Sequence, residues 1–249
     1  VREYKRKPEL FIDRKLAAGV PSVVSHSLLV AQLAVYLASC LEWTEAQVTR
    51  FAVGGLLHDV GLVLEGWSAE TANGGPPLWG ESETHGEAGA SWIRQNGKWG
   101  TQLQSICADH HERWNGTGLP RGAQRQEVDL PARLIGLIDH FVLLTRPWQG
   151  EGRSPSEALE VLAEETRQGL FDPAAFRALV GHLSWFPLGS VLRLVDGRVV
   201  RIKKPDPRKP GNPVAEILEG EGKGEQIALP GRESVAEDLT LKAEVSLDS

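Results

Sequence analysis

Six of the seven histidines in this chain of 249 residues lie within its first 140 residues, where they coincide with helical hydrophobic patterns. His26 follows a Pro-Ser helix start and shares its stripe with apolar residues three and four positions away. His58 lies on a second stripe, which opens with a capping-box pattern at Thr44 and Gln47 and ends near Gly61. Both imidazoles are therefore predicted to point into a helical core. A lone histidine at such a position is usually a core residue whose ring nitrogens are hydrogen-bonded. Several buried imidazoles together would be a costly cluster of unsatisfied polar groups unless they served a function.

Helical periodicity continues through most of the first 185 residues. It predicts further helices over residues 85–95, 103–111, 130–144, 155–170 and 172–183. The segment 64–84 contains adjacent prolines and two tryptophans, is rich in glycine and has no clear period. It predicts a long connection of the kind that often serves as a lid.

The pattern changes after Pro187. Residues 190–195 and 198–203 are short β-prone runs on either side of Asp196-Gly197, the signal of a two-residue hairpin, and 214–218 is a third predicted strand. The last nineteen residues are acidic and weakly patterned, so we expect them to be partly loose. The prediction is an all-α fold class with a small C-terminal β appendage. Its domains are a helical domain over residues 1–187 and a β-hairpin appendage with an acidic tail over residues 188–249.

Composition limits the classes of function. Asp and Glu outnumber Lys and Arg by 33 to 27, a formal net charge of −6, which argues against a nonspecific binder of nucleic acid polymers or acidic membranes. The two cysteines are too few for a disulfide framework, no apolar run reaches the ~20 residues that cross a bilayer, and no signal peptide is recognisable. We therefore expect a cytoplasmic protein. The chain has no methionine, even at position 1, so it either begins at a non-methionine start or is a piece of a longer protein.

Five histidines and two aspartates carry the chemistry that the sequence predicts. They lie near helix ends or on inward stripes of different predicted helices: His26, His58, Asp59, His85, His110, His111 and Asp139. Imidazole is a ligand for iron, zinc and manganese, and a carboxylate can bridge two such ions. The set therefore predicts a two-metal site. Two divalent cations outweigh two aspartates and a bridging hydroxide, which favours an anionic substrate such as a phosphodiester.

The motifs around these residues follow the order of a known family. They are HDVG (58–61), HGEAG (85–89), HHERWNGTGLP (110–120), ARLIGLIDHF (132–141) and RPW (146–148), and FPLGSVLRLVDGRV (186–199) continues the match. Over roughly residues 20–202 the chain resembles the HD-GYP family, a branch of the HD superfamily of metal-dependent phosphohydrolases. The resemblance implies an HD-superfamily helical bundle.

The resemblance also implies hydrolysis of cyclic di-GMP to pGpG or GMP by a phosphodiesterase with two divalent metal ions, iron or manganese foremost. In the implied ligand sets, one ion takes His26, His58, Asp59 and Asp139, and the other takes Asp59, His85, His110 and His111. His58 and Asp59 are the implied catalytic residues, and a hydroxide bridging the two ions attacks the phosphorus.

Substrate contacts and partners follow from the same resemblance. Arg146 is implied to hold a nonbridging phosphate oxygen, and Gly116 and Gly118 are implied to line the approach to the site. Cyclic di-GMP is the predicted small-molecule partner. Apart from the resemblance, the β appendage is either a structural cap on the helical domain or a surface for a partner such as a diguanylate cyclase domain, and a homodimer is left open.

The chain departs from the family's pattern at several positions. Leu62 replaces the lysine of HD-x-G-Lys, Leu119 replaces the tyrosine of Gly-Tyr-Pro, and Gln149 replaces a basic residue. The other departures are Asn115 for an aspartate, Ser22 for the glutamate of a third metal site, and a connection from Asp139 to Arg146 that is two residues short. One lost charge-assisted phosphate contact costs about 1.5–3 kcal/mol. Three alternatives therefore stay open: a phosphodiesterase of reduced activity, a metal-containing sensor or interaction module without strong catalysis, and a phosphohydrolase of another nucleotide.

Overall fold

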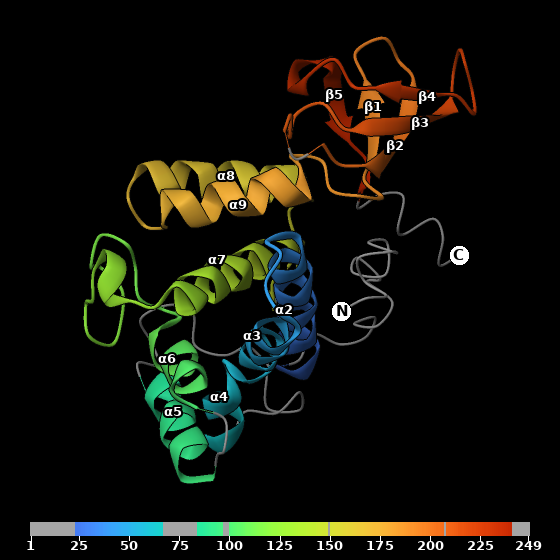
Figure 1. The fold of residues 1–249 in the computed structure, drawn as a ribbon. Coiled ribbons are helices and arrows are strands. Elements are labelled where there is room, and N and C mark those ends of the chain that lie inside the picture. The colour runs from blue at the N-terminus through green and yellow to red at the C-terminus, as the bar shows by residue number, and fades with distance from the viewer. Residues whose placement is uncertain (1–22, 67–83, 97–99, 149, 207, 241–249) are drawn as a thin grey trace. The chain divides into compact units, whose positions relative to one another are not determined.

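The computed structural model describes residues 23–66, 84–96, 100–148, 150–206 and 208–240 (Figure 1). Ser22, Gln149 and most of the predicted connection 64–84 lie outside the described residues. The helices are α2 Val23–Cys40, α3 Glu45–Leu57, α4 Val60–Leu64, α5 His85–Asn96, α6 Thr101–Asp109, the short 3-10 helix η3 Arg125–Glu127, α7 Leu130–Thr145, α8 Pro155–Arg167 and α9 Pro173–Leu183. The mostly helical fold class is thereby confirmed.

The helix predicted from Thr44 begins where its capping box lies. The Thr44 side chain caps the Gln47 amide at 3.4 Å, and the Gln47 side-chain oxygen accepts the Thr44 amide at 2.9 Å. The helix does not continue to Gly61, because α3 ends at Leu57 and Asp59 leaves the helical conformation at φ −100° before α4 begins. His58 and Asp59 therefore occupy a break between two helices.

Helix α7 is the central helix of the helical part. It packs against α2, α3 and α6, while α2 also packs on α3, and α5 packs on α4 and α6 (Figure 1). Most of its length is buried, from Ala132 to Val142, with Asp139 among the buried residues. A helix that is apolar on nearly all sides is suited to the middle of a bundle. Its position explains how one aspartate can reach side chains from several helices.

Of the described residues, α2 alone has the length and composition of a membrane-crossing helix, with 18 residues and a mean hydropathy of 1.6. Its buried face carries His26 and packs on α3 and α7. Core helices pass the same test, so this finding is weak evidence for a membrane span.

Contacts divide the chain into two units. One contains the residues up to Gly152 together with Leu162–Phe176, and the other contains Arg153–Val161 and the residues from Arg177 onward. The division runs through α8 and α9 because the ends of both helices bond to the β segment. Ser156 donates to Asp238 at 2.6 Å, Arg232 pairs with Glu160, and the Trp185 amide donates to the Pro210 carbonyl. The predicted boundary between residues 187 and 188 stays a prediction.

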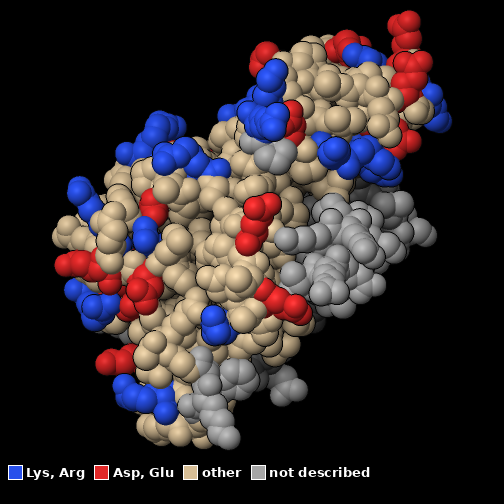
Figure 2. Space-filling view, viewed as in Figure 1, with Lys and Arg blue, Asp and Glu red and all other residues tan. Residues whose placement is uncertain are grey.

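Charged side chains of both signs are distributed over the surface. On the face drawn in Figure 2, Lys and Arg are interspersed with Asp and Glu. Some charged side chains form exposed pairs, such as Arg167 with Glu164. Such pairs contribute little to stability.

The β appendage is a five-stranded antiparallel sheet of order β4-β3-β2-β1-β5. Its strands are β1 Val191–Leu194, β2 Val199–Lys204, β3 Val214–Glu219, β4 Gln226–Ala228 and β5 Val235–Asp238. Three strands were predicted and are present. Within the tail that was expected to be partly loose, residues 232–238 form a 3-10 turn and β5, which pairs with β1, and residues 241–249 lie outside the described residues.

The β1–β2 connection also differs from the predicted two-residue hairpin. The Gly197 amide donates to the Leu194 carbonyl, and the Leu194 amide donates to the Arg198 carbonyl, so three residues form the loop. Gly197 has φ +89°, the left-handed conformation that a three-residue hairpin loop requires at this point. The Asp-Gly signal was therefore correct for the hairpin and wrong for its loop length.

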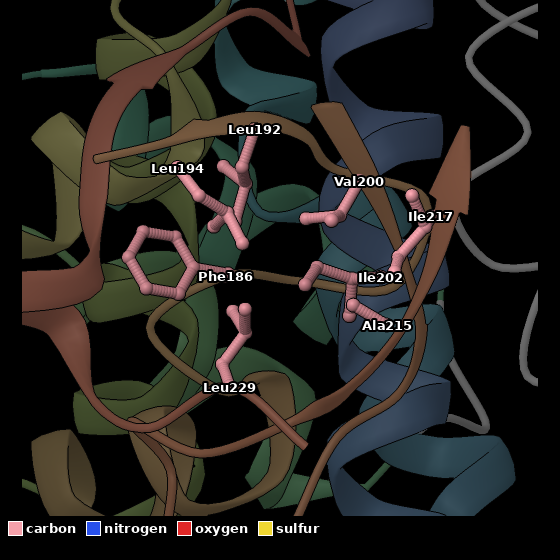
Figure 3. Packing of buried hydrophobic residues seen from close by; sticks show 8 residues of the cluster. All are labelled: Phe186, Leu192, Leu194, Val200, Ile202, Ala215, Ile217 and Leu229. Carbon is pink, nitrogen blue, oxygen red and sulfur yellow. The ribbon is translucent and has the colours of Figure 1, made fainter. Parts of the chain in front are cut away.

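The sheet has its own hydrophobic core, which Figure 3 shows from close by. Side chains two residues apart on β1, β2 and β3 point to the same side, as the alternation of a strand dictates. The buried residues of this cluster are Phe186, Leu192, Leu194, Val200, Ile202, Ala215, Ile217 and Leu229.

Candidate metal centre

Asp59 lies at the centre of the predicted ligand set. Its Oδ2 is 3.2 Å from Nε2 of His58 and 3.8 Å from Nε2 of His26. Its Oδ1 is 3.4 Å from Nε2 of both His85 and His110. The break between α3 and α4 allows this reach, because it turns Asp59 away from the helical path of His58. The two oxygens of one carboxylate therefore face two separate groups of imidazoles.

The first group is completed by Asp139 from α7. Its Oδ1 is 2.8 Å from Nε2 of His26 and 3.7 Å from Nε2 of His58. The Asp139 side chain is 2% exposed, so its charge has no access to bulk water and must be balanced locally.

The second group joins the start of α5 to the end of α6. His85 is the first residue of α5, and His110 and His111 follow the last residue of α6. The Nε2 atoms of His85 and His111 are 3.1 Å apart. One ligand atom from each of Asp59, His85, His110 and His111 lies within 4.8 Å of the others, and the same holds for His26, His58 and Asp59. The structure thus brings all seven predicted ligand residues together.

Two histidines are held in the tautomer that a metal ligand needs. Nδ1 of His58 donates to the Gly55 carbonyl at 2.8 Å, and Nδ1 of His110 donates to the Cys107 carbonyl at 2.9 Å. In a neutral imidazole the other nitrogen then carries a lone pair. These Nε2 atoms are buried and form no hydrogen bond, and the same is true of Asp139 Oδ2. Orphaned acceptors gathered in one buried cluster fit a bound cation.

The electrostatics of the cluster favour the ligand forms of the aspartates. Burial opposes ionisation of Asp59 and Asp139, but the surrounding imidazoles outweigh it and hold both pKa values well below their usual range. Burial lowers the pKa of His110 and His111, so both are neutral. Burial also opposes protonation of His58, but the Asp59 carboxylate outweighs it and raises the pKa of His58, so a cation bound at Nε2 would have to displace a proton.

Two glycines allow the ligand-bearing elements to approach this closely. A Cβ on Gly61 would lie 1.8 Å from the His85 carbonyl oxygen, and a Cβ on Gly136 would lie 2.2 Å from the His110 carbonyl oxygen. Any larger residue would push the ligand backbone away. Both glycines lie in the motifs that carried the family resemblance, but the role of Gly136 had no signal apart from that motif.

The last two histidines lie apart from the cluster. His140 neighbours Asp139 in sequence, but its Nε2 is 2.9 Å from Glu165 Oε2. His182 is half-buried near the end of α9. Neither belongs to the two ligand groups.

The predicted phosphate contact, Arg146, is the half-buried C-cap of α7, seven residues after Asp139. Two residues further, the Trp148 ring lies 5.2 Å from the His26 ring, centroid to centroid. Trp148 was quoted within the RPW motif, but no role was predicted for it. An aromatic ring against a ligand imidazole limits how far that imidazole can rotate.

The predicted glycines lie in the loop that follows His111. Gly116 has φ +80°, and a Cβ on Gly118 would lie 2.3 Å from the Arg113 amide nitrogen. Leu62 is 3% exposed within the hydrophobic core, at the position where the family has a lysine. Leu119 is half-buried, and Asn115 caps the Thr117 amide at 3.1 Å.

Comparisons with known proteins identify the domain that contains this cluster. Residues 23–143 match the family model described as HD domain. The chain is 32% identical over 178 residues to a cyclic di-GMP phosphodiesterase of Pseudomonas aeruginosa, a match that covers 70% of this chain and 42% of that protein. It is 30% identical over 161 residues to a 3'3'-cGAMP-specific phosphodiesterase of Vibrio cholerae, covering 62% of this chain and 36% of that protein. The chain therefore spans less than half the length of these curated relatives.

A solved structure shares the fold. The crystal structure of a cyclic GMP-AMP-specific phosphodiesterase of Vibrio cholerae superposes with a TM-score of 0.50 at 20% identity, covering 69% of this chain and 47% of that one. At this identity the likeness extends to the fold only. With the family match and the sequence relatives, the conclusion is that the chain carries an HD domain over residues 23–143, with relatives of the HD-GYP type.

Proposed function

We propose that this protein is a metal-dependent phosphodiesterase of cyclic dinucleotides, with cyclic di-GMP as its preferred substrate. The observation that carries the proposal is Asp59, whose two carboxylate oxygens face two separate groups of buried imidazoles. One carboxylate between two groups of nitrogen ligands suits a pair of cations. Relatives named as phosphodiesterases of cyclic di-GMP and of 3'3'-cGAMP support the substrate class.

The residues fit two divalent ions, with iron or manganese first among the candidates. One ion would be held by His26, His58, Asp59 and Asp139, and the other by Asp59, His85, His110 and His111. Bound divalent cations supply Lewis acidity, which activates water and neutralises the charge on a phosphodiester. A cytoplasmic location, a diguanylate cyclase partner and a homodimer stay predictions.

The residues of the protein orient the proposed ligands and contact the phosphate. Backbone carbonyls at Gly55 and Cys107 keep protons on Nδ1 of His58 and His110, which leaves Nε2 of each ring available to a cation. The Arg146 guanidinium binds a nonbridging phosphate oxygen through a charge-assisted hydrogen bond. Six of the seven proposed ligands are buried and His111 is half-buried, which limits competition from bulk water.

Leu62 favours a second candidate function, a metal-containing sensor or interaction module with little catalysis. Its aliphatic side chain is buried where the family has a lysine, so it offers no charge to the substrate. Losing one charge-assisted phosphate contact costs about 1.5–3 kcal/mol, about one to two powers of ten in affinity or rate. A third candidate is a preference for another cyclic dinucleotide, which the names of the Vibrio relatives favour.

A turnover assay with a panel of substrates tests the three candidates. The protein is purified anaerobically, analysed for metal content, loaded with iron or manganese, and given cyclic di-GMP, 3'3'-cGAMP and cyclic di-AMP. We expect fastest turnover of cyclic di-GMP, with pGpG or GMP as the product identified by chromatography. Binding of cyclic di-GMP by metal-loaded protein without any turnover would instead establish the sensor.

Three variants show whether the cluster is responsible. His58→Ala and Asp59→Ala should each lower turnover by more than about 100-fold. Mutating a residue that only hydrogen-bonds to a metal ligand already lowers metal affinity or activity by up to about 100-fold. His182→Ala makes the same chemical change outside the cluster and should leave turnover unchanged. Equal turnover in all three variants contradicts the proposal.

A further inference from the structure

Glu112 directly follows the ligand pair His110–His111 and is itself buried, with 7% of its surface exposed. Its Oε1 accepts the Arg121 amide at 2.8 Å, and its Oε2 accepts the Ala123 amide at 2.9 Å. Both oxygens are therefore used by the backbone at the far end of the loop of residues 113–123, which we call the glycine loop. The proposed function assigns no role to this carboxylate.

Three more contacts attach the glycine loop to the same short segment. The Leu119 amide donates to the His111 carbonyl at 3.2 Å, and the Arg121 guanidinium donates to Asp109 at 2.9 Å. A Cβ on Gly118 would lie 2.4 Å from the His111 carbonyl oxygen, so the loop backbone lies directly against that ligand residue. The loop is thus fastened to residues 109–112 at its middle and at its end.

Burying a carboxylate is costly unless hydrogen bonds compensate for the lost water. A loop needing only local structure could be closed by its own turns, such as that of Asn115 with Thr117. Glu112 instead reaches across nine and eleven residues to two amides. Because its backbone neighbours His111, any shift of the ligand pair moves the anchor of the loop.

We propose that Glu112 is a positioning residue that couples the glycine loop to the metal ligands His110 and His111. It fixes where the loop lies relative to the metal centre, and occupancy of the centre in turn restrains the loop, since a coupling between two sites is reciprocal. The inference rests on the proposed function for the role of the loop in lining the substrate approach. Metal binding and loop order can be measured without turnover.

Limited trypsin digestion reports the loop directly, because Arg121 and Arg125 are exposed within or beside it. In the wild-type protein we expect added manganese to slow cleavage after Arg121. In Glu112→Ala, cleavage there should be faster and should no longer respond to manganese. Glu112→Gln should be intermediate, because its amide oxygen still accepts one of the two amides while its NH2 group opposes the other.

Glu87→Gln is the matched control. It removes the same charge from an exposed side chain two residues after the ligand His85. It should behave as wild type in digestion and in a chelator competition for manganese. In the same competition, Glu112→Ala should bind manganese about tenfold more weakly, because the loop no longer restrains the ligand pair.

Kinetics separate positioning from a general loss of structure. With cyclic di-GMP, Glu112→Gln should raise KM by about tenfold while kcat changes less, because substrate contacts of the loop are displaced and the ligands remain. If Glu112→Gln digests as wild type with and without manganese, the inference is wrong. If wild-type protein turns over no cyclic dinucleotide, the proposed function fails, and digestion and manganese affinity still decide the role of Glu112.

Discussion

Cys107 illustrates how the site constrains residues that are not ligands. Its Sγ donates to the Leu57 carbonyl at 3.2 Å, and the side chain is fully buried one turn before His110. Burial, with the Asp59 charge as a second cause, raises the pKa of its thiol from 9.0 to about 12. Alkylating agents react with an accessible thiolate. The raised pKa keeps the Cys107 thiol protonated, and burial keeps the reagent from reaching it.

We predict that iodoacetamide at about pH 8 leaves Cys107 unlabelled in the native protein and labels it in concentrated guanidinium. Peptide mass spectrometry gives the measurement. The raised pKa also has a stability consequence. The contribution of the neutral thiol is complete below pH 9.0 and is lost as the pH rises toward 12. Native labelling at the denatured rate would contradict this burial.

Among the elements, the β1–β2 hairpin shows how much depends on which face a residue occupies. Leu192 on β1 is fully buried in the sheet core (Figure 3). Val195, three residues on in the hairpin loop, is 68% exposed. β1 pairs with both β2 and β5, so its inward side chains contact the middle of the core. A cavity there cannot be filled by a simple shift of an edge strand.

Leu192→Ala should lower the free energy of unfolding of the sheet by about 2–5 kcal/mol, the range for truncating a buried leucine. Val195→Ala removes two methyl groups from the surface and should change it by less than about 0.5 kcal/mol. Urea unfolding followed by circular dichroism compares the two variants. Equal midpoints would mean that the sheet core does not pack as described.

In the molecule as a whole, the candidate ligands connect elements that are distant along the chain. α2 supplies His26, the α3–α4 break supplies His58 and Asp59, α5 and α6 supply the second group, and α7 supplies Asp139. A cation bound by such a set holds helices together that otherwise carry several uncompensated buried polar atoms. Metal binding therefore adds to the free energy of folding.

Chelation should accordingly destabilise the metal-loaded protein. At free metal ~100 times Kd, binding contributes about 2.7 kcal/mol, so its removal should lower Tm by about 5–10 °C. Asp59→Asn keeps the shape of the side chain and loses the charge between the two imidazole groups. The Tm of the Asp59→Asn variant should not respond to chelator. Calorimetry with and without chelator measures the Tm of the wild type and of the variant, and an equal shift in the two proteins would contradict a metal at Asp59.

Helices and candidate ligand residues could be predicted from local patterns, because a helix and its buried face depend on near neighbours. A stripe with steps of three and four residues predicts a buried face, and a capping box marks a helix start, as at Thr44. The types of side chain on those stripes predicted the seven candidate ligands. The Asp-Gly pair likewise predicted the first hairpin.

Only the tertiary structure decided what depends on residues far apart in the chain. Asp139 reaches His26 across 113 residues, and β5 pairs with β1 although its own sequence is acidic and weakly patterned. Which oxygen of Asp59 faces which imidazoles, and the use of Glu112 to fasten a loop, likewise follow from chain packing. Local patterns report the preferences of the backbone and of one face, whereas these contacts depend on how separate helices and strands meet after the chain has folded.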